Sequence, residues 1–427
     1  MFYKETIFQD TQAGKIPKDW RCVEINQVCE VRRGASPRPI NDPKYFSEYG
    51  RGWVRIADVT ASYKYLRKTS QYLSNLGESK SVKVNPGDLI MSICATIGKP
   101  IIVDMEACIH DGFVVFRNLS KEVDVEFLFY MLQKNESKFA NMRQIGTQGN
   151  LNTYLVGKTP IPLPPIEEQR AIAGVLGVVD SVIAKTDEVI AKTERLKKGL
   201  MQTLLTRGIG HKEFKETEIG KIPKTWQVVK IKDVAEINRE SIDPSKEMPN
   251  KTFLYVDIDS VEEGKIRNPE RILGTEAPSR ARRVIHVNDV IMSTVRPYLK
   301  AFAIVPKELD NQICSTGFAV LSCKNNIVPY FLLSVLFSDQ TISQCNRMMV
   351  GGQYPALNQS QVSEIKIPLP PLYEQQKIAD IIWTVDKKLE FERNEKARLE
   401  RIKRGLMDLL LTGRIRVKVD RGAVCSG

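Results

Sequence analysis

Apolar and small residues recur along one long segment with alternating spacings of four and three, at Ile172, Leu176, Val179, Ile183, Thr186, Ile190 and Thr193. A second segment has the same spacing at Ile378, Ile382, Val385, Leu389, Glu392, Lys396 and Leu399. Such spacing places side chains on one helix face, as in a coiled-coil seam. We therefore predict two long helices, at 166–210 and 372–412, that pack against each other. Because Glu392 and Lys396 are charged, a second arrangement stays open, in which each helix packs on its own globular part.

The two helical segments belong to a longer internal repeat. Gly14-Lys-Ile-Pro-Lys-Asp-Trp20 recurs as Gly220-Lys-Ile-Pro-Lys-Thr-Trp226, an offset of 206 residues. Residues 161–180 recur as 367–386 at the same offset, with 11 of 20 positions identical. Self-similarity at one offset across half of the 427 residues indicates duplication of a complete fold.

Each copy contains short runs rich in β-branched and aromatic residues, separated by Pro, Gly and Asn. The runs at 53–59, 101–103, 114–116, 253–258 and 302–305 predict strands. The alternations at 22–31 and 228–237 predict a strand or a first helical turn. One amphipathic helix per copy is predicted at 125–144 and 329–349, ending at glycine.

These patterns predict a mixed α/β fold with two similar globular domains, at 1–165 and 211–371. If the helices at 166–210 and 372–412 run antiparallel as a coiled coil, they join the domains with pseudo-twofold symmetry, which is the arrangement that the resemblance described below implies. Residues 413–427 are expected to form a basic tail.

The charge of the chain favours an anionic partner. The net charge is +12 and the pI is about 9.2. Residues 14–165 have 21 Lys and Arg against 15 Asp and Glu, and residues 220–371 have 19 against 16. A basic excess on both repeated blocks is typical of nucleic-acid binding, although many basic proteins bind no nucleic acid.

Motifs for metal binding and catalysis are missing from the sequence. The eight cysteines form no C-x-x-C pair, so we expect reduced core thiols; Cys108 and His110 are a lone C-x-H. Phosphate-binding loops, G-x-G-x-x-G and G-x-S-x-G are not found. The E-x-K spacing of some nucleases occurs five times in this lysine-rich chain and is uninformative. We therefore expect a chain without catalytic activity, metal or cofactor of its own.

The repeated motifs resemble those of the specificity subunits of type I restriction–modification systems. The similarity lies in the G-x-I-P-x-x-W motif, the IPLPP-x-x-EQ-x-x-I-A block, the long helices and the closing Gly405-Leu-Met and Leu-Leu-Leu-Thr-Gly-Arg414, and extends from about Gly14 to Ile415. In that family, two target-recognition domains each read one half of a bipartite DNA sequence. The two helices form the spacer and the docking surface for methyltransferase subunits.

The resemblance also implies where the chemistry takes place. Two methyltransferase subunits would use S-adenosylmethionine to methylate adenine at N6, and restriction subunits, where they exist, would use ATP and Mg²⁺ for cleavage. The asparagine of the family's N-P-P-aromatic methyltransferase signature is missing here, since Leu163 and Leu369 precede the two Pro-Pro pairs. The chain itself would bind double-stranded DNA.

Candidate DNA-binding residues follow from the chemistry of base recognition. Arginine pairs with guanine, Asn and Gln pair with adenine, and any cation contacts phosphate. In the first copy the candidates are Arg32, Arg33, Arg38, Arg143, Gln148 and Asn150. In the second copy they are Arg280, Arg282, Arg283, Arg296, Arg347, Gln353 and Tyr354. For any one of them, a solvated surface charge is an equally good interpretation.

Two other classes of function are weighed against the specificity subunit. A free-standing repressor or architectural protein with a bipartite operator fits the duplication equally well, and a neighbouring methyltransferase gene would distinguish the two. A single-chain nuclease lacks a site. No segment has the roughly 20 apolar residues of a membrane span, and the start lacks a secretory signal, so a cytoplasmic location is expected.

Overall fold

The computed structural model describes residues 2–142, 151–262, 264–349 and 355–418. The chain divides into two compact units. Unit 1 consists of Met1–Glu188 and Asn394–Gly427, and unit 2 of Val189–Arg393. Each unit therefore contains one globular part together with a portion of both long helices.

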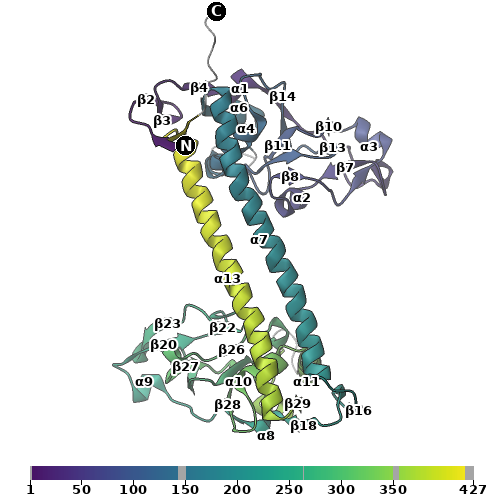
Figure 1. Cartoon of the computed structure of the whole chain (residues 1–427), viewed down its shortest axis with the longest axis vertical. Helices are drawn as coiled ribbons and strands as arrows, with labels where there is room; N and C mark the ends of the chain where they lie inside the picture. The colour runs from purple at the N-terminus through teal and green to yellow at the C-terminus, as the bar shows by residue number, and fades with distance from the viewer. Residues whose placement is uncertain (1, 143–150, 263, 350–354, 419–427) are drawn as a thin grey trace, which may run out of the picture. The chain divides into compact units, whose positions relative to one another are not determined.

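The two predicted long helices are confirmed. Helix α7 spans Ile166–Arg207 and α13 spans Leu372–Leu410, coloured teal and yellow in Figure 1. Pro164-Pro165 and Pro370-Pro371 directly precede the two helices. Since proline is tolerated only in the first turn of a helix, these pairs set where each helix begins. Gly208 and Gly413, with φ of 65° and 69°, follow them in the left-handed region that commonly ends a helix. At ~1.5 Å per residue, each helix is roughly 60 Å long.

Equivalent side chains of the two helices are buried in their respective units. Ile172, Leu176 and Ile183 of α7 are fully buried in unit 1. Their counterparts 206 residues later, Ile378, Ile382 and Leu389, are buried in unit 2. The four–three pattern therefore marks the face of each helix that is shielded from water.

The EQ block attaches the start of each long helix to its own globular part. The Trp20 indole donates to Glu168 at 3.2 Å, and the Trp226 indole donates to Glu374 at 3.0 Å. The neighbouring Gln169 accepts from the Asp124 amide at 2.9 Å. Its counterpart Gln375 accepts from Val328 at 2.9 Å. Two motifs separated by almost 150 residues are thus joined by hydrogen bonds in both copies.

A second duplicated contact joins a tyrosine, an aspartate and a lysine. In unit 1, Tyr130 donates to Asp180 at 2.6 Å, and Lys403 pairs with Asp180 at 2.8 Å. In unit 2, Tyr330 donates to Asp386 at 2.7 Å, and Lys197 pairs with Asp386. The aspartate and the lysine belong to different long helices. Each unit therefore holds portions of α7 and α13 together through the same chemistry.

We expect Tyr130→Phe to lower the free energy of unfolding of unit 1 by about 1.5–3 kcal/mol, because the hydroxyl donates to a buried carboxylate. Burial, reinforced by Asp180, raises the pKa of Tyr130, so its proton stays in place for donation. Calorimetric unfolding of the full chain measures the effect. Tyr72→Phe is the matched control, since no hydrogen bond of its hydroxyl occurs in the described part of the chain. Equal shifts for both variants would contradict the assignment.

The globular part of unit 1 contains two five-stranded sheets. One has the order β5 (Glu30–Arg33), β14 (Phe113–Arg117), β11 (Leu89–Ser92), β12 (Pro100–Val103) and β8 (Tyr65–Leu66). The other has the order β10 (Val82–Val84), β13 (Ala107–Ile109), β7 (Arg51–Val54), β9 (Tyr72–Leu73) and β6 (Phe46–Ser47). The helices here are α1 (Ile25–Val28), α2 (Ile56–Ala61), α3 (Asn75–Ser79), α4 (Val125–Lys134), α5 (Glu136–Asn141) and α6 (Thr153–Gly157).

Unit 2 repeats this plan with two four-stranded sheets. Their orders are β19 (Ala235–Ile237), β28 (Phe318–Cys323), β25 (Val290–Ser293), β26 (Phe302–Ile304), and β23 (Glu270–Leu273), β20 (Thr252–Val256), β27 (Gln312–Ser315), β24 (Ala281–Ile285). The helices are α8 (Ile231–Val234), α9 (Pro244–Glu247), α10 (Pro329–Leu336), α11 (Asp339–Met348) and α12 (Gln359–Ser363).

Short two-stranded pairs complete both units. They are β2 (Phe8–Thr11) with β3 (Gly14–Pro17), β4 (Arg21–Glu24) with β15 (Pro160–Leu163), β16 (Phe214–Thr217) with β17 (Gly220–Pro223), β18 (Gln227–Lys230) with β29 (Lys366–Leu369), and β21 (Val261–Glu262) with β22 (Lys265–Ile266). The alternations at 22–31 and 228–237 are thus a strand, a helical turn and a second strand.

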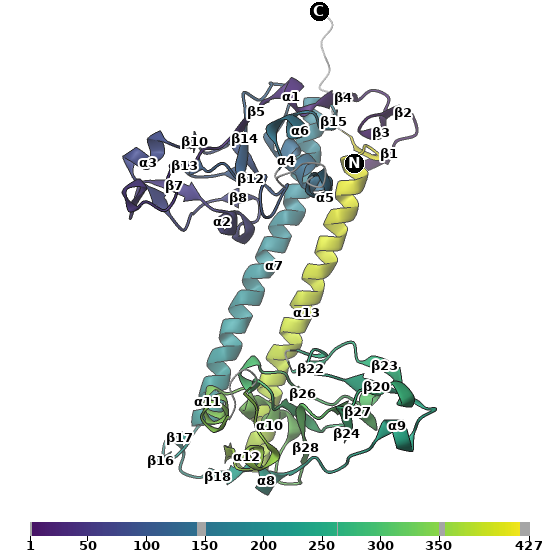
Figure 2. The same ribbon diagram turned by 180° about the vertical axis from the view of Figure 1, so that it is seen from behind.

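The central sheet of each unit separates two hydrophobic cores. Successive residues of a strand point to opposite faces. Leu89 of β11 therefore joins the core that contains Ile172 of α7, whereas Ile90 joins the core between the two sheets. In unit 2, Val290 and Ile291 of β25 divide in the same way. The layers are long helices with α4 or α10, a central sheet, and an outer sheet; α4 lies against α7 in Figures 1 and 2.

Three predicted elements are shorter in the structure than the sequence patterns indicated. The helix predicted at 125–144 is divided into α4 and α5, because Asn135 has φ −91° and ψ 6° and its side chain donates to the Met131 carbonyl. The helix predicted at 329–349 is divided into α10 and α11, because the Ser338 side chain caps a new start. The strand predicted at 53–59 ends at Val54, since the Asp58 carboxylate accepts from the Arg55 amide and starts α2.

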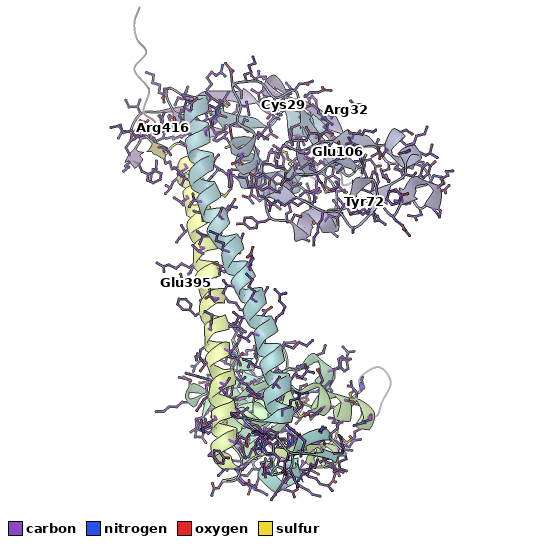
Figure 3. The ribbon with its side chains drawn as sticks, turned by 45° about the vertical axis from the view of Figure 1, so that its right-hand side comes forward. Cys29, Arg32, Tyr72, Glu106, Glu395 and Arg416 are labelled. Carbon is purple, nitrogen blue, oxygen red and sulfur yellow. The ribbon has the colours of Figure 1, made fainter. Side chains whose placement is uncertain are left out.

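Part of the expected basic tail belongs to the fold of unit 1. Strand β30 (Ile415–Val417) pairs with β1 (Phe2–Lys4). Arg416 is buried and donates to Glu168 at 2.6 and 2.7 Å and to Asp19 at 2.9 Å. Figure 3 labels Arg416 near the ends of the two helices in this unit. Its positive charge is therefore neutralised inside the unit rather than offered to a partner.

Candidate nucleic-acid interface

In unit 1, two of the predicted arginines meet at the turn before β14. Arg33 donates through Nε to the Asp111 carbonyl at 2.7 Å, and Arg38 pairs with the Asp111 carboxylate at 2.7 Å. Ser36 donates to the same carboxylate at 2.6 Å. Burial alone would raise the pKa of Asp111, but Ser36 and Arg38 hold that pKa below its usual value. The ionised Asp111 fixes the positions of two exposed arginines.

Glycine is required where this arginine loop crosses the turn. A Cβ atom on Gly34 would lie 2.1 Å from the His110 carbonyl oxygen. His110 is itself half-buried, and burial followed by the charge of Arg55 lowers its pKa to about 4. A neutral His110 leaves the positive charge of this surface to the arginines.

Arg32 has a different environment from Arg33. In β5, Arg32 pairs with Val115 and Arg33 with Val114, so the two side chains leave opposite faces of the sheet. Arg32 is exposed, and no ion pair or hydrogen bond of its side chain occurs among the described residues. It is labelled in Figure 3. A free guanidinium of this kind suits a phosphate contact.

In unit 2, Arg280, Arg282 and Arg283 differ in solvent exposure and in the partners of their side chains. Arg280 is exposed and accepts through its carbonyl from the Thr316 amide at 2.8 Å. Arg282 lies 3.5 Å from Asp243. Arg283 is half-buried opposite Cys314, and its Nε is buried without a hydrogen-bond partner in the described structure. Burial lowers the pKa of the Arg283 guanidinium. A buried donor without a partner is costly, so Arg283 occupies an unfavourable position within unit 2.

The remaining candidates divide into two described residues and five that lie outside the described residues. Arg296 precedes a 3-10 turn, and Arg347 is exposed in the last turn of α11. Outside the described residues are Arg143, Gln148, Asn150, Gln353 and Tyr354. Leu151 and Leu357 follow the segments that contain these five residues. Leu151 contacts the hairpin after β11 in unit 1, and Leu357 contacts the equivalent hairpin after β25 in unit 2.

Equivalent hydrogen bonds bring three loops together in both units. In unit 1, the Ile93 amide donates to the Gly112 carbonyl at 2.8 Å, and the Leu151 amide donates to the Ile93 carbonyl at 3.3 Å. In unit 2, the Thr294 amide donates to Gly317 at 2.8 Å, and Leu357 donates to Thr294 at 2.9 Å. The hairpin after β11 or β25, the turn before β14 or β28, and the segment at Leu151 or Leu357 therefore form one loop cluster per unit.

The loop cluster contains residues that the sequence patterns did not single out. Asp111 and Ser36 position the arginines of unit 1, and Lys300 ends the hairpin turn of unit 2 with a hydrogen bond to the Phe337 carbonyl at 3.0 Å. Asp111-Gly-Phe113 and Thr316-Gly-Phe318 are similar tripeptides at equivalent turns, and this similarity was the signal that could have located the turn. The pairing of Asp111 with Arg38 had no signal, because 73 residues separate the two.

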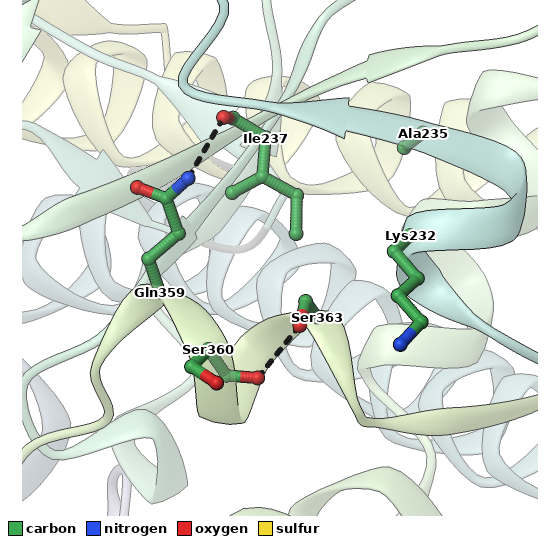
Figure 4. A pocket seen from close by; sticks show the side chains of 6 residues that line it. All are labelled: Lys232, Ala235, Ile237, Gln359, Ser360 and Ser363. Atoms are coloured by element: carbon green, nitrogen blue, oxygen red, sulfur yellow. Dashed lines mark hydrogen bonds between the residues drawn. The ribbon is translucent and has the colours of Figure 1, made fainter.

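Other surfaces of the described chain fit a nucleic acid less well. A pocket of about 490 Å³ in unit 2 is lined by Lys232, Ala235, Ile237, Gln359, Ser360 and Ser363, as Figure 4 shows. Its cation, Lys232, is paired with Glu364. In the described residues, no group of three or more His, Cys, Asp or Glu is arranged to hold a metal ion, and no helix has both the length and the hydropathy for crossing a membrane.

Four of the seven described cysteines, Cys29, Cys108, Cys314 and Cys345, are buried, and the other three are partly exposed. Cys22, Cys29, Cys94, Cys108, Cys314, Cys323 and Cys345 are free thiols in the described part of the chain. Burial raises the pKa of Cys108 to about 11 and that of Cys345 to about 12. These groups are therefore protonated at neutral pH.

Comparison with known proteins places the fold in one family. The family model described as type I restriction modification DNA specificity domain matches twice, over residues 17–195 and 223–401. The type I restriction enzyme MjaVIII specificity subunit of Methanocaldococcus jannaschii is 29% identical over 437 residues, and 98% of each chain is covered. The putative MjaX specificity subunit of the same organism is 31% identical over 436 residues, with 98% of each covered.

Solved structures share the fold. The crystal structure of a type I restriction–modification S subunit from M. genitalium has a TM-score of 0.56 at 15% identity, covering 92% of this chain and 96% of that chain. A chain from a type I restriction–modification system studied for its complex assembly and conformational transition has a TM-score of 0.55 at 20% identity, covering 94% and 99%. With two copies of its domain and full-length relatives, the chain belongs to the family of type I restriction–modification DNA specificity subunits.

Proposed function

We propose that each globular part reads one half of a bipartite DNA target. The observation that carries this proposal is the loop cluster. Equivalent hydrogen bonds hold it together in both units, but the side chains around it differ between the units. Arg32, Arg33 and Arg38 lie beside the cluster of unit 1, whereas Arg280, Arg283 and Arg296 lie near that of unit 2. A shared scaffold with different polar groups is what two readers of different base sequences require.

The two long helices act as an antiparallel coiled coil with pseudo-twofold symmetry. In unit 1, Asp180 pairs with Lys403 and Asp187 with Lys396, so the numbering rises along α7 while it falls along α13. In unit 2, Glu194 pairs with Arg393 at 2.7 Å. These ion pairs support a spacer that sets the distance between half-sites, flanked by target-recognition domains at 1–165 and 211–371.

The same helices provide the docking surface for two methyltransferase subunits. Apolar side chains are exposed on both, among them Val178 of α7 and Trp383 and Phe391 of α13. Exposed aromatic residues are enriched where proteins associate. The bound subunits would supply S-adenosylmethionine chemistry on adenine, restriction subunits would supply ATP- and Mg²⁺-dependent cleavage, and this chain would contribute recognition without catalysis.

Co-expression with a type I methyltransferase subunit from the same genome tests this function. N6-methyladenine is mapped across the host genome by long-read sequencing. We expect methylation at one split motif, and no methyl transfer by the chain alone. Methyl transfer by the isolated chain would contradict the proposal. Tight DNA binding by the chain without any directed methylation would instead favour a free-standing DNA-binding protein.

A further inference from the structure

The hairpins β11–β12 and β25–β26 carry turns of the same construction. In unit 1, the Ser92 amide donates to the Lys99 carbonyl at 3.1 Å; in unit 2, the Ser293 amide donates to the Ala301 carbonyl at 3.1 Å. The serine hydroxyls also donate into their turns, to the Thr96 and Val295 carbonyls. Between the paired strands the turn of unit 2 is one residue longer, because Met91 pairs with Pro100 but Met292 with Phe302.

Both turns place residues in the left-handed region at equivalent points. Ala95 and Gly98 have φ of 53° and 87°, and Arg296 and Lys300 have φ of 47° and 58°. Left-handed backbone costs a non-glycine residue free energy, whereas glycine adopts it readily. Unit 2 nevertheless has a cation at both positions. Strained residues of this kind concentrate at functional sites.

The side chains at the two tips differ in size and exposure. In unit 1, Ile97 is buried in the core, and the small Ala95 and Thr96 are exposed. In unit 2, Tyr298 is 43% exposed and Leu299 is 66% exposed, while Pro297 is buried. The longer turn of unit 2 therefore exposes two large apolar side chains, Tyr298 and Leu299, to solvent. Exposing them lacks a structural benefit, because burial of apolar surface is what stabilises a fold.

The surroundings of this apolar tip are basic. Arg296 and Lys300 lie on either side of it, and the Arg296 amide donates to the Pro355 carbonyl at 3.0 Å. The Lys300 ammonium donates to the Phe337 carbonyl and lies 3.8 Å from the exposed carboxylate of Asp339, so its charge is partly balanced within unit 2. The hairpin turn packs against α11, in which Arg347 is exposed. The Thr294 amide donates to the Gly317 carbonyl, and the neighbouring Thr316 amide donates to the Arg280 carbonyl. Cations around an apolar tip complement the phosphates that flank base edges in a DNA groove.

We propose that Tyr298 and Leu299 make an apolar contact with a thymine methyl group in the half-site read by unit 2. The proposal rests on the proposed DNA-reading function. The thymine C5-methyl group is the one apolar feature of base edges in the major groove. An adenine to be methylated in that half-site brings a thymine with it. The turn of unit 1 has no large exposed apolar side chain, so we propose the thymine-methyl contact only for the half-site read by unit 2.

The test uses the complex of the full chain with methyltransferase subunits, on a duplex that carries the mapped target. We expect the double variant Tyr298→Ala/Leu299→Ser to lower affinity for the target by roughly tenfold. Affinity for a duplex without the target should stay unchanged. Replacing one particular thymine of the half-site by deoxyuridine should weaken the wild-type complex similarly, with no further loss in the double variant.

Val287→Ser is the matched control, because Val287 is an exposed apolar residue of unit 2 outside the hairpin turn. Circular dichroism and thermal unfolding verify that both variants fold. Wild-type affinity of the double variant, or equal losses on target and non-target duplexes, would overturn the proposal. These outcomes are distinct from failure of the proposed function, in which the wild-type complex itself would recognise no target.

Discussion

Replacing Glu168 by Gln is expected to lower the free energy of unfolding of unit 1 by about 1.5–3 kcal/mol, because it removes the bidentate, charge-assisted pair of the buried Arg416 guanidinium, while Glu5 and Asp19 still pair with it. Arg416 donates to both carboxylate oxygens of Glu168, and both side chains are buried. Burial disfavours the charged Arg416, but the hydrogen bonds that Arg416 donates to Glu168 and Asp19 raise its pKa above the usual value. Thermal and urea unfolding of the full chain measure the loss.

Glu122→Gln is the matched control for this variant. Glu122 pairs with Arg21 at 2.6 Å in the same unit, but both side chains are more than half exposed. Water screens such a pair, so its loss is expected to cost at most about 1 kcal/mol. Similar losses from Glu168→Gln and Glu122→Gln would show that the buried network is not what fastens β30 and α7 to unit 1.

Replacing Arg283 by Ala is expected to weaken binding to the specific target by about 1–3 kcal/mol and to relax specificity at one base pair. The physical reason is that Arg283 is only half-buried and has no ion pair among the described residues, so its guanidinium is available to donate to a guanine. Competition binding against duplexes with single base changes measures both effects. Methylation mapping of the co-expressed complex reports the relaxed base in vivo.

Arg267→Ala provides the comparison for Arg283→Ala, because Arg267 is exposed in unit 2 and lies 3.9 Å from Glu262. We expect Arg267→Ala to leave target specificity unchanged. If Arg283 contacts only a phosphate, its loss would weaken binding evenly across sequences and make the salt dependence shallower. Unchanged binding by Arg283→Ala would remove this residue from the interface.

Local patterns in the sequence were sufficient for the long elements. The four–three spacing and the prolines before Ile166 and Leu372 locate α7 and α13, although the helices end at Arg207 and Leu410 rather than at the predicted 210 and 412. The repeat at one offset indicated two copies of one fold. Helix periodicity did not reveal the break at Asn135, because the apolar pattern continues through a residue whose backbone conformation is set by its own side-chain hydrogen bond.

The candidate interface shows the limit of local patterns more clearly. Composition and loop position selected Arg33, Arg38 and Arg283 as equal candidates, but their environments differ. Asp111 fixes the first two from 78 and 73 residues away, whereas Arg283 has a buried donor without a partner in the described chain. Arg416 looked like tail charge and is instead buried against a carboxylate 248 residues earlier.

The sequence by itself determined the duplication, the two long helices and the basic excess, since each depends on residue identity at short or constant spacing. Tertiary structure alone decided which arginines are neutralised, where the hairpin tips stand and which apolar residues stay exposed. The physical reason is that hydrogen bonding, desolvation and burial depend on atoms brought together across the fold. No sequence pattern distinguished Tyr298 and Leu299, and the turn between the left-handed residues Arg296 and Lys300 places them at the surface.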